Sequence, residues 1–282
     1  MIRIIMYSIC ILLFWGCEDE LPPNSEFDNN IVAAKSFGSG KGTQSNPYLI
    51  FNINHLKKLV DDVNNGNSYA NTYFRLTTDI QVTADEWILI GVKINGPTFN
   101  GNFDGGDHII SGILKSDRHK TFGFFGAIDG DARITNLTIA ATVQSEGTYT
   151  GAIAGESWSA NINNCRITGT VKGGDSTGGI LGISYHTTIR NCDVCNTITG
   201  EGNAGGIVGT FYGEEIHTSL NTGDIFGYPG HTGGLVGRQY VDSHIYSCCT
   251  NRGRVNGEEA KANNQTGNGN TIETCPDRHT KR

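Results

Sequence analysis

The sequence predicts an all-β fold in which short strands coil into a β-solenoid. A phrase that ends in glycine recurs along the chain, and its closing residues are Gly126, Gly155, Gly182, Gly209 and Gly237. An isoleucine follows each phrase at a similar spacing, at residues 134, 162, 189, 216, 245 and 272. A fixed period of about 20 to 50 residues indicates a solenoid or a related array. The runs between the phrases are short, β-branched and broken by turn residues, so each repeat is a coil of strands.

The glycine phrases resemble the GLUG-motif repeat family, named for a glycine, a bulky apolar residue, an uncertain residue and a second glycine. The segment from Gly178 to Gly182, which reads GGILG, is a representative phrase. Segments 42–50, 87–91 and 99–112 also fit, so the resemblance extends roughly from Asn46 to the C-terminus. It implies a right-handed parallel β-helix, as on bacterial surface proteins and adhesins and at the N-terminus of some IgA-cleaving metallopeptidases. It implies no shared reaction.

Composition limits the classes of partner. The chain of 282 residues contains 39 glycines against 6 prolines, which suits a turn-rich β protein with a thin core. Its formal net charge of −7 argues against nucleic acid as a partner and offers no basic face to anionic membranes. The unbroken repeat favours one elongated body over two domains.

The N-terminus reads as a lipoprotein signal peptide over residues 1–17. Arg3 supplies the positive charge, and residues 4–15 form an apolar run that is too short to span a bilayer comfortably. Gly16-Cys17 resembles a bacterial lipobox, in which Cys17 becomes the acylated N-terminus; the alternative is an ordinary signal peptide with a chance cysteine. The acidic residues 18–20 resemble the signal that sends some lipoproteins to the outer face of the outer membrane. The expected location is therefore the outer membrane, with the protein exposed at the cell surface.

The remaining chain divides into a tether and a repeat body. Residues 18–42 are rich in Pro, Asn, Ser and Gly and are expected to be flexible. The β-helix occupies residues 43–282, with a short N-terminal capping segment at about 43–72. Within it the spacing of Leu56, Leu59, Val60 and Val63 predicts a helix over 55–64 that covers the open sheet edge of the first coil.

Strands are expected over the segments that surround this helix and follow it. The first begins near Tyr48, and others lie at 73–80, at 86–91 and twice within 99–112. Regular coils should run from residue 122 to about 257. The polar stretch 258–270 replaces the next glycine phrase, and 271–275 forms one last strand.

Equivalent residues of successive coils should stack about 4.8 Å apart, the spacing of neighbouring strands. Three residues after each marker isoleucine stand Leu137, Cys165, Cys192, Ser219, Cys248 and Cys275. Such a column of small residues is expected to face the core, where free cysteine acts as a small hydrophobe. Neighbours in the column are also within disulfide reach, so the redox state stays open, with unpaired thiols favoured. The C-x-x-C formed by Cys192 and Cys195 lacks the context of a redox or zinc site.

No constellation for catalysis, metal binding or a cofactor emerges from the sequence. The 8 histidines occupy unrelated repeat positions, and the chain lacks H-E-x-x-H and Gly-x-Ser-x-Gly. The aspartates of segments 104–107 and 129–131 could supply oxygen ligands to calcium, but turn formation explains both. We therefore predict no catalytic residues, no metal site and no cofactor.

One column is a candidate for ligand binding. Three residues after four successive closing glycines stand Trp158, Tyr185, Tyr212 and Tyr240. Stacked at strand spacing they would form a ladder roughly 15 Å long. The charges of Glu156 and Arg238 two residues earlier suggest that this side faces outward. The rings could offer stacking faces to sugars or anchor a protein, or they could only stabilise a turn.

These features leave three classes of function. The leading hypothesis is a non-catalytic, lipid-anchored surface module or adhesin that binds a glycan or a protein of a host or bacterial surface. The second is a carbohydrate-active β-helix enzyme of the polysaccharide lyase or glycosidase type, which would need a groove with paired carboxylates or a base and a metal. The third is a purely structural spacer.

We expect Cys17→Ala to abolish lipid attachment and to release or mislocalise the protein, because acylation requires that thiol. Metabolic labelling with a palmitate analogue measures the attachment. Undiminished labelling of the variant would contradict the lipobox.

Overall fold

The computed structural model describes residues 36–82, 88–92, 96–240, 246–259 and 266–267. These residues form an all-β body of parallel strands stacked as a solenoid, with α1 (Ile53–Asn64) as the only helix in these ranges. The prediction of a parallel β-helix is confirmed. The expected signal peptide and most of the expected tether, residues 1–35, lie outside the described chain.

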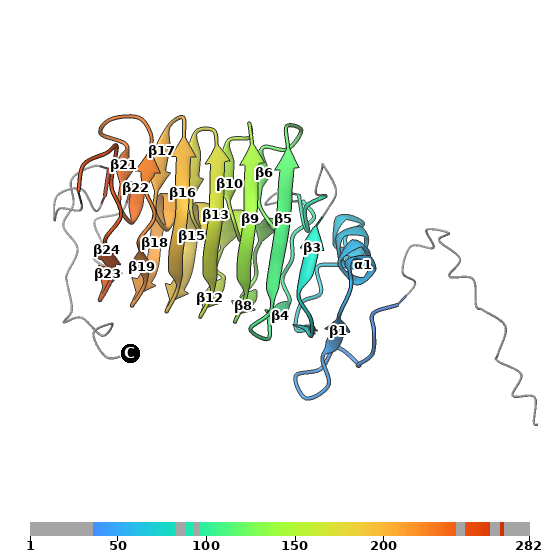
Figure 1. Ribbon diagram of the computed structural model, residues 1–282. Coiled ribbons are helices and arrows are strands. Elements are labelled where there is room, and N and C mark those ends of the chain that lie inside the picture. Colours follow the sequence, from blue (N-terminus) through green and yellow to red (C-terminus); the bar gives the residue numbers. More distant parts are fainter. Residues whose placement is uncertain (1–35, 83–87, 93–95, 241–245, 260–265, 268–282) are drawn as a thin grey trace, which may run out of the picture. The chain divides into compact units, whose positions relative to one another are not determined.

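A single coil shows how the repeat is built. Its strands are β10 (Tyr149–Gly151), β11 (Ala154–Trp158), β12 (Asn161–Asn163) and β13 (Arg166–Gly173). Each pairs in parallel with its equivalent in the next coil: β10 with β14, β11 and β12 with the continuous β15, and β13 with β16. One coil therefore contributes to three different sheets, as successive arrows show in Figure 1.

The sheets differ in strand length, and we name them accordingly. The short-strand sheet contains β6 (Thr121–Phe122), β10, β14 (Ser176–Gly178), β17 (Asn203–Gly205) and β21 (Thr232–Gly233). The long-strand sheet contains β3 (Ile80–Val82), β5 (Ile109–Ser116), β9 (Thr138–Ser145), β13, β16 (Asp193–Gly200), β19 (Leu220–Asn221), β20 (Ile225–Phe226) and β24 (Thr250–Asn251). The ladder sheet contains β1 (Tyr48–Ile50), β2 (Tyr73–Leu76), β4 (Asn102–Asp104), β7 (Phe125–Ile128), β8 (Arg133–Thr135), β11, β12, β15 (Leu181–Arg190), β18 (Val208–His217), β22 (Val236–Gln239) and β23 (Tyr246–Ser247).

The marker isoleucines form a buried column of the core. Ile134, Ile162, Ile189 and Ile216 are paired in register and are at most 1% exposed. The column continues toward the N-terminus through Phe103. This arrangement confirms that the repeat period converts into stacked positions.

The last coil departs from the predicted register by one residue. Ile216 pairs with Tyr246 and not with Ile245, which lies outside the described residues together with Ile272. The next core position after Ser219 is consequently Cys249, which is 2% exposed, and not the predicted Cys248. A one-residue insertion in the loop before β23 is enough to shift every later position.

The glycine phrase also continues further than the sequence predicts. Thr266 forms a parallel bridge with Val236, and the amide of Gly267 donates to the carbonyl of Val236 at 3.0 Å. We expected residues 258–270 to replace the glycine phrase, and this is wrong for Thr266 and Gly267, which take the positions of the phrase in one further coil. The final strand predicted at 271–275 lies outside the described residues.

A column of left-handed residues turns the chain from the ladder sheet into the long-strand sheet. It comprises Asn136, Asn164, Asn191, Thr218 and Cys248, with φ of 52°, 54°, 52°, 48° and 58°. Asparagine tolerates this conformation better than other residues with a Cβ. Asn164 Nδ2 also donates to Asn136 Oδ1 at 2.8 Å, which ties successive turns together.

The closing glycines are required by close backbone approach. Gly182 and Gly209 do not have positive φ. A Cβ on Gly182 would lie 2.5 Å from the amide nitrogen of Thr150, in the short strand of the preceding coil. A Cβ on Gly209 would lie 2.5 Å from the amide nitrogen of Thr177 in the same way. The glycines therefore let the ladder sheet meet the short-strand sheet with no side chain between them.

The cap helix forms near its predicted position, two residues earlier. It begins after its N-cap residue Asn52, whose side chain accepts a hydrogen bond from the amide of His55 at 3.0 Å. Its four predicted apolar residues are all buried in the common core. The side chain of Asn64 bonds the carbonyl of Leu89 and the amide of Gly91, which ties the helix end to the first coils.

The irregular first coils match the prediction in part. The segment 99–112 contains β4 and the start of β5, as expected. The single strand expected at 73–80 is instead two strands, β2 and β3, which belong to different sheets. Of the strand expected at 86–91, residues 86 and 87 are outside the described chain, and Ile90 forms only an isolated bridge with Phe125.

We expect Gly182→Ala to lower the free energy of unfolding by about 1–3 kcal/mol, because the new methyl group would overlap backbone atoms that cannot rotate away. Gly230→Asn is a control, since Gly230 has φ 79° and no heavy atom within 4 Å of an added Cβ. Denaturant titration measures both. An unchanged stability of the Gly182 variant would show that the corner can open.

Thr218→Asn should raise the free energy of unfolding by about 1 kcal/mol. Thr218 is a β-branched residue with φ 48°, and its buried hydroxyl lacks a hydrogen-bond partner. Asparagine relieves the backbone strain that the branched side chain causes. The reciprocal variant Asn191→Thr should lose a similar amount, and equal melting temperatures for all three proteins would contradict this account.

Candidate functional site

The four predicted aromatic residues form one continuous stack, which we call the aromatic ladder. Trp158 pairs with Tyr185 and Tyr185 with Tyr212 in the parallel register, and the amide of Tyr240 donates to the carbonyl of Phe211. Successive ring centroids are 4.4, 4.7 and 4.7 Å apart, with interplanar angles of 30°, 15° and 1°. The structure thus brings together every ligand-binding residue that the sequence predicted.

The geometry changes what the ladder can offer to a ligand. Rings this close and this nearly parallel are stacked face to face, so their faces contact one another. The expectation that each ring presents an open stacking face is wrong. Trp158 and Tyr240 at the ends are 36% and 48% exposed, and the two central tyrosines are half-buried. Arg238 covers the end at Tyr240, with its Cζ 4.7 Å from the ring centroid.

A second row of polar side chains faces the base of the ladder. Tyr149, Ser176 and Asn203 are in register on the short-strand sheet, and we call them the corner row. Asn203 Nδ2 donates to Thr210 Oγ1 at 3.0 Å, and the Ser176 hydroxyl also contacts Thr210. Thr210 is therefore buried, although it holds the outward position that Glu156 and Arg238 occupy in other coils. The contacts with the corner row explain why Thr210 is buried although Glu156 and Arg238, at the same position of other coils, are partly exposed.

The phenols of this region stay protonated well above neutral pH. Burial, followed by the neighbouring Tyr149, Tyr212 and Glu156, raises the pKa of Tyr185 to about 12. Burial also raises the pKa of Tyr149, with Glu156 as the next cause, and that of Tyr212. Each hydroxyl therefore remains both a donor and an acceptor of hydrogen bonds.

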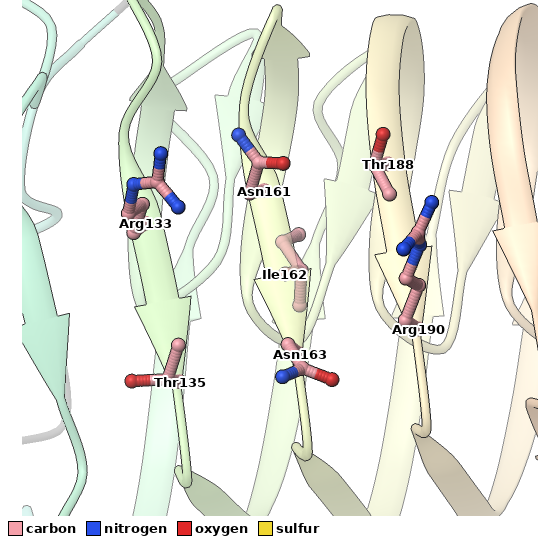
Figure 2. A pocket seen from close by; sticks show the side chains of 7 residues that line it. All are labelled: Arg133, Thr135, Asn161, Ile162, Asn163, Thr188 and Arg190. Atoms are coloured by element: carbon pink, nitrogen blue, oxygen red, sulfur yellow. The ribbon is translucent and has the colours of Figure 1, made fainter.

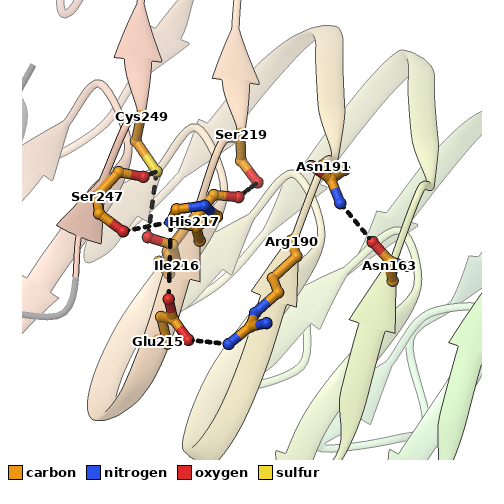
Figure 3. Close-up of polar contacts among 9 residues, drawn as sticks. All are labelled: Asn163, Arg190, Asn191, Glu215, Ile216, His217, Ser219, Ser247 and Cys249. Atoms are coloured by element: carbon orange, nitrogen blue, oxygen red, sulfur yellow. Dashed lines mark hydrogen bonds and ion pairs between the residues drawn. The ribbon is translucent and has the colours of Figure 1, made fainter. Parts of the chain in front are cut away.

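A serine, a histidine and a glutamate meet on the ladder sheet, but not as a catalytic triad (Figure 3). His217 Nδ1 contacts the Ser247 hydroxyl and lies 3.7 Å from Glu215 Oε1. A triad needs the acid and the serine on opposite ring nitrogens, so that one orients the imidazole while the other accepts the proton. Here both lie at one nitrogen, and Glu215 also forms an ion pair with Arg190. The cluster is a surface polar network.

The cysteines of the described residues have structural roles. Cys165, Cys192 and Cys249 are free and buried, and burial raises the pKa of Cys249 to about 12. Cys192 is buried in the core whereas Cys195 lies half-buried on the outward side, so this C-x-x-C is not a redox pair. Cys248 is disulfide-bonded, which differs from the unpaired state that the sequence favoured.

Two negative findings apply to the described part of the chain. It contains no group of three or more histidine, cysteine or acidic side chains placed to hold a metal ion. None of its helices is long and apolar enough to cross a membrane.

A cavity that the sequence analysis missed lies on the same sheet as the ladder (Figure 2). It has a volume of about 290 Å³. It is lined by Arg133, Thr135, Asn161, Ile162, Asn163, Thr188 and Arg190. We call it the arginine pocket. Its residues recur at the repeat spacing on three coils, so a comparison of outward columns could have found it.

Comparisons with known proteins agree with the fold. No family model matches the chain. A crystal structure titled "putative immunoglobulin A1 protease" from Bacteroides ovatus has a TM-score of 0.50 and 19% identity, over 84% of this chain and 86% of that chain. At this identity the likeness shows the fold alone.

Two curated proteins are similar in sequence over part of the chain. A "putative Gly-rich membrane protein" of Evansella cellulosilytica is 31% identical over 143 residues, which are 46% of this chain and 15% of that protein. Halomucin of Haloquadratum walsbyi is 29% identical over 159 residues, which are 51% of this chain and 2% of that protein. The chain thus spans only a small part of the relatives that it matches. The similarity is confined to a segment of much longer proteins.

Proposed function

We propose that this protein is a non-catalytic surface module that binds a glycan along the aromatic ladder. The observation that carries the proposal is the ladder itself, a row of partly exposed rings on four consecutive coils beside the polar corner row. A site that repeats at strand spacing suits an extended ligand better than a compact one.

The chemistry of the two rows favours a sugar chain over a protein. Tyr185 and Tyr212 are half-buried, and Glu156 lies near enough to Tyr185 to help raise its pKa, after burial and the neighbouring tyrosines. Sugars present apolar C–H groups and many hydroxyls, which match ring edges and protonated phenols. The outer face of Trp158 adds one stacking surface at the end of the ladder. Protein hot spots, in contrast, favour fully desolvated pockets.

The location of the module is a separate proposal. Anchoring to the outer membrane through acylated Cys17 would display the coils at the cell surface. The name of the Evansella relative, a membrane protein, is consistent with such a location. More than one acyl chain gives stable anchoring, whereas a single chain gives only reversible binding.

A glycan array and a host-protein array probed with the full chain test the function. Saturable glycan binding without turnover is the expected result. Binding only to a protein would favour the adhesin without glycan specificity, and turnover of a polysaccharide would favour the lyase or glycosidase alternative. If the protein binds nothing on either array, the purely structural spacer becomes the favoured function.

We expect Tyr185→Phe and Tyr212→Phe each to lower the affinity for the selected glycan by about 1 kcal/mol, because each removes one hydroxyl that bonds the ligand. Both variants keep the stacked rings, so their melting temperatures should match that of the unmodified protein. Isothermal titration calorimetry measures the affinities. Tyr73→Phe, on another coil outside the ladder, serves as the control, and an effect no larger than that of the control would count against the ladder as the site.

A further inference from the structure

The arginine pocket concentrates hydrogen-bond donors on one face of an acidic protein. Arg133, Asn161 and Thr188 form one row across β8, β12 and β15, and Thr135, Asn163 and Arg190 form the next row. The two arginines lie at opposite corners, with Cα atoms roughly 12 Å apart from the spacing and rise of strands. Both long side chains lie along the pocket wall in Figure 2.

Arg133 carries a charge that no carboxylate in the described part of the chain neutralises. It is exposed and makes no ion pair with any carboxylate of the described residues. Arg190 is paired with Glu215 on the side away from Arg133, and Glu215 also lies 3.7 Å from His217. The other nearby carboxylate, Asp104, accepts from Asn136 Nδ2 at 2.8 Å and lies 3.7 Å from Arg75 Nε. These two carboxylates, which are in register with Thr188 and Thr135 of the pocket, therefore already have partners.

The asparagine between the arginines is oriented as a donor. Asn163 Oδ1 accepts a hydrogen bond from Asn191 Nδ2 at 2.8 Å (Figure 3). Its own amide group is thereby left to donate, and Figure 2 shows its nitrogen turned toward the side of Thr135. Thr135 and Thr188 also line the pocket, and threonine hydroxyls can donate to and accept from the hydroxyls beside an oxyanion.

The pocket is within reach of a chain that lies on the ladder. Tyr185 of the ladder and Thr188 of the pocket belong to the same strand, β15. Three residues of chain span at most roughly 10 Å, and His186 between them, with φ 48°, bends the strand. The coils of Trp158 and Tyr185 also contribute Asn161 and Thr188 to the pocket, so the two sites overlap along the solenoid.

We propose that the arginine pocket binds the carboxylate or sulfate group of an acidic polysaccharide whose chain continues along the aromatic ladder. This inference rests on the proposed glycan function and names its ligand class. Arg133 supplies the charge, while Asn163 and the threonines bond the hydroxyls next to the acidic group. The formal net charge of −7 disfavours nonspecific binding of polyanions elsewhere on the surface. Binding of an acidic polysaccharide should therefore depend on the pocket.

The test uses affinity electrophoresis of the full chain with polygalacturonate, alginate and chondroitin sulfate. Each polymer is compared with its carboxyl-reduced or desulfated counterpart, which separates the carboxylate from the sulfate as the bound group. We expect at least one acidic polymer to bind about 10-fold more tightly than its neutral counterpart. Arg133→Gln should abolish that preference. Arg166→Gln, which removes the same charge from the long-strand sheet, should preserve it.

The outcomes separate the two proposals. Equal binding of acidic and neutral polymers, unaffected by Arg133→Gln, would overturn the pocket and leave glycan binding by the ladder intact. Failure of every polymer to bind would overturn both. Equal losses in the Arg133 and Arg166 variants would reduce the effect to general charge attraction and overturn the pocket. Binding of polyglutamate as tight as that of the polysaccharides would overturn the assignment to sugars.

Discussion

The close approach of two backbones at each glycine corner is the contact on which the rest of the solenoid depends. The strand of one coil passes so near the short strand of the preceding coil that an added Cβ would lie 2.5 Å from a backbone nitrogen. Glycine alone permits this approach. This corner repeats in the regular coils, where it fixes how closely the two sheets meet, while the ladder hydrogen bonds set a constant rise from coil to coil.

Constant rise converts the sequence repeat into rows of equivalent side chains. The buried isoleucines, the left-handed asparagines, the aromatic ladder and the arginine pocket are four results of the same parallel register. Rows of identical chemistry suit ligands that are themselves repetitive. This correspondence is the physical reason to expect a polymer, and not a compact molecule, on the ladder sheet.

The ladder stabilises the solenoid, and in the proposed function it also contacts the ligand. Each stacked pair contributes about 0.5–1.5 kcal/mol beyond the area that it buries, so the rings help to hold neighbouring coils together. Stacking also withdraws the ring faces from the solvent and leaves edges and hydroxyls outside. Raised pKa values, with Tyr185 at about 12, keep those hydroxyls protonated. A ligand on this surface would therefore meet hydrogen-bonding hydroxyls more than open aromatic faces.

The sequence alone determined the solenoid, its period, the cap helix and the aromatic row, because a repeat of about 27 residues constrains every coil in the same way. It did not determine the register of the last coil, where one extra residue moves Cys249 into the place predicted for Cys248. The sequence also did not reveal that the rings stack face to face. They do so because neighbouring strands are too close for the rings to lie parallel to the surface of the sheet. The pocket between Arg133 and Arg190 likewise needed the tertiary structure. These arginines are 57 residues apart in the sequence and become neighbours only when three coils stack.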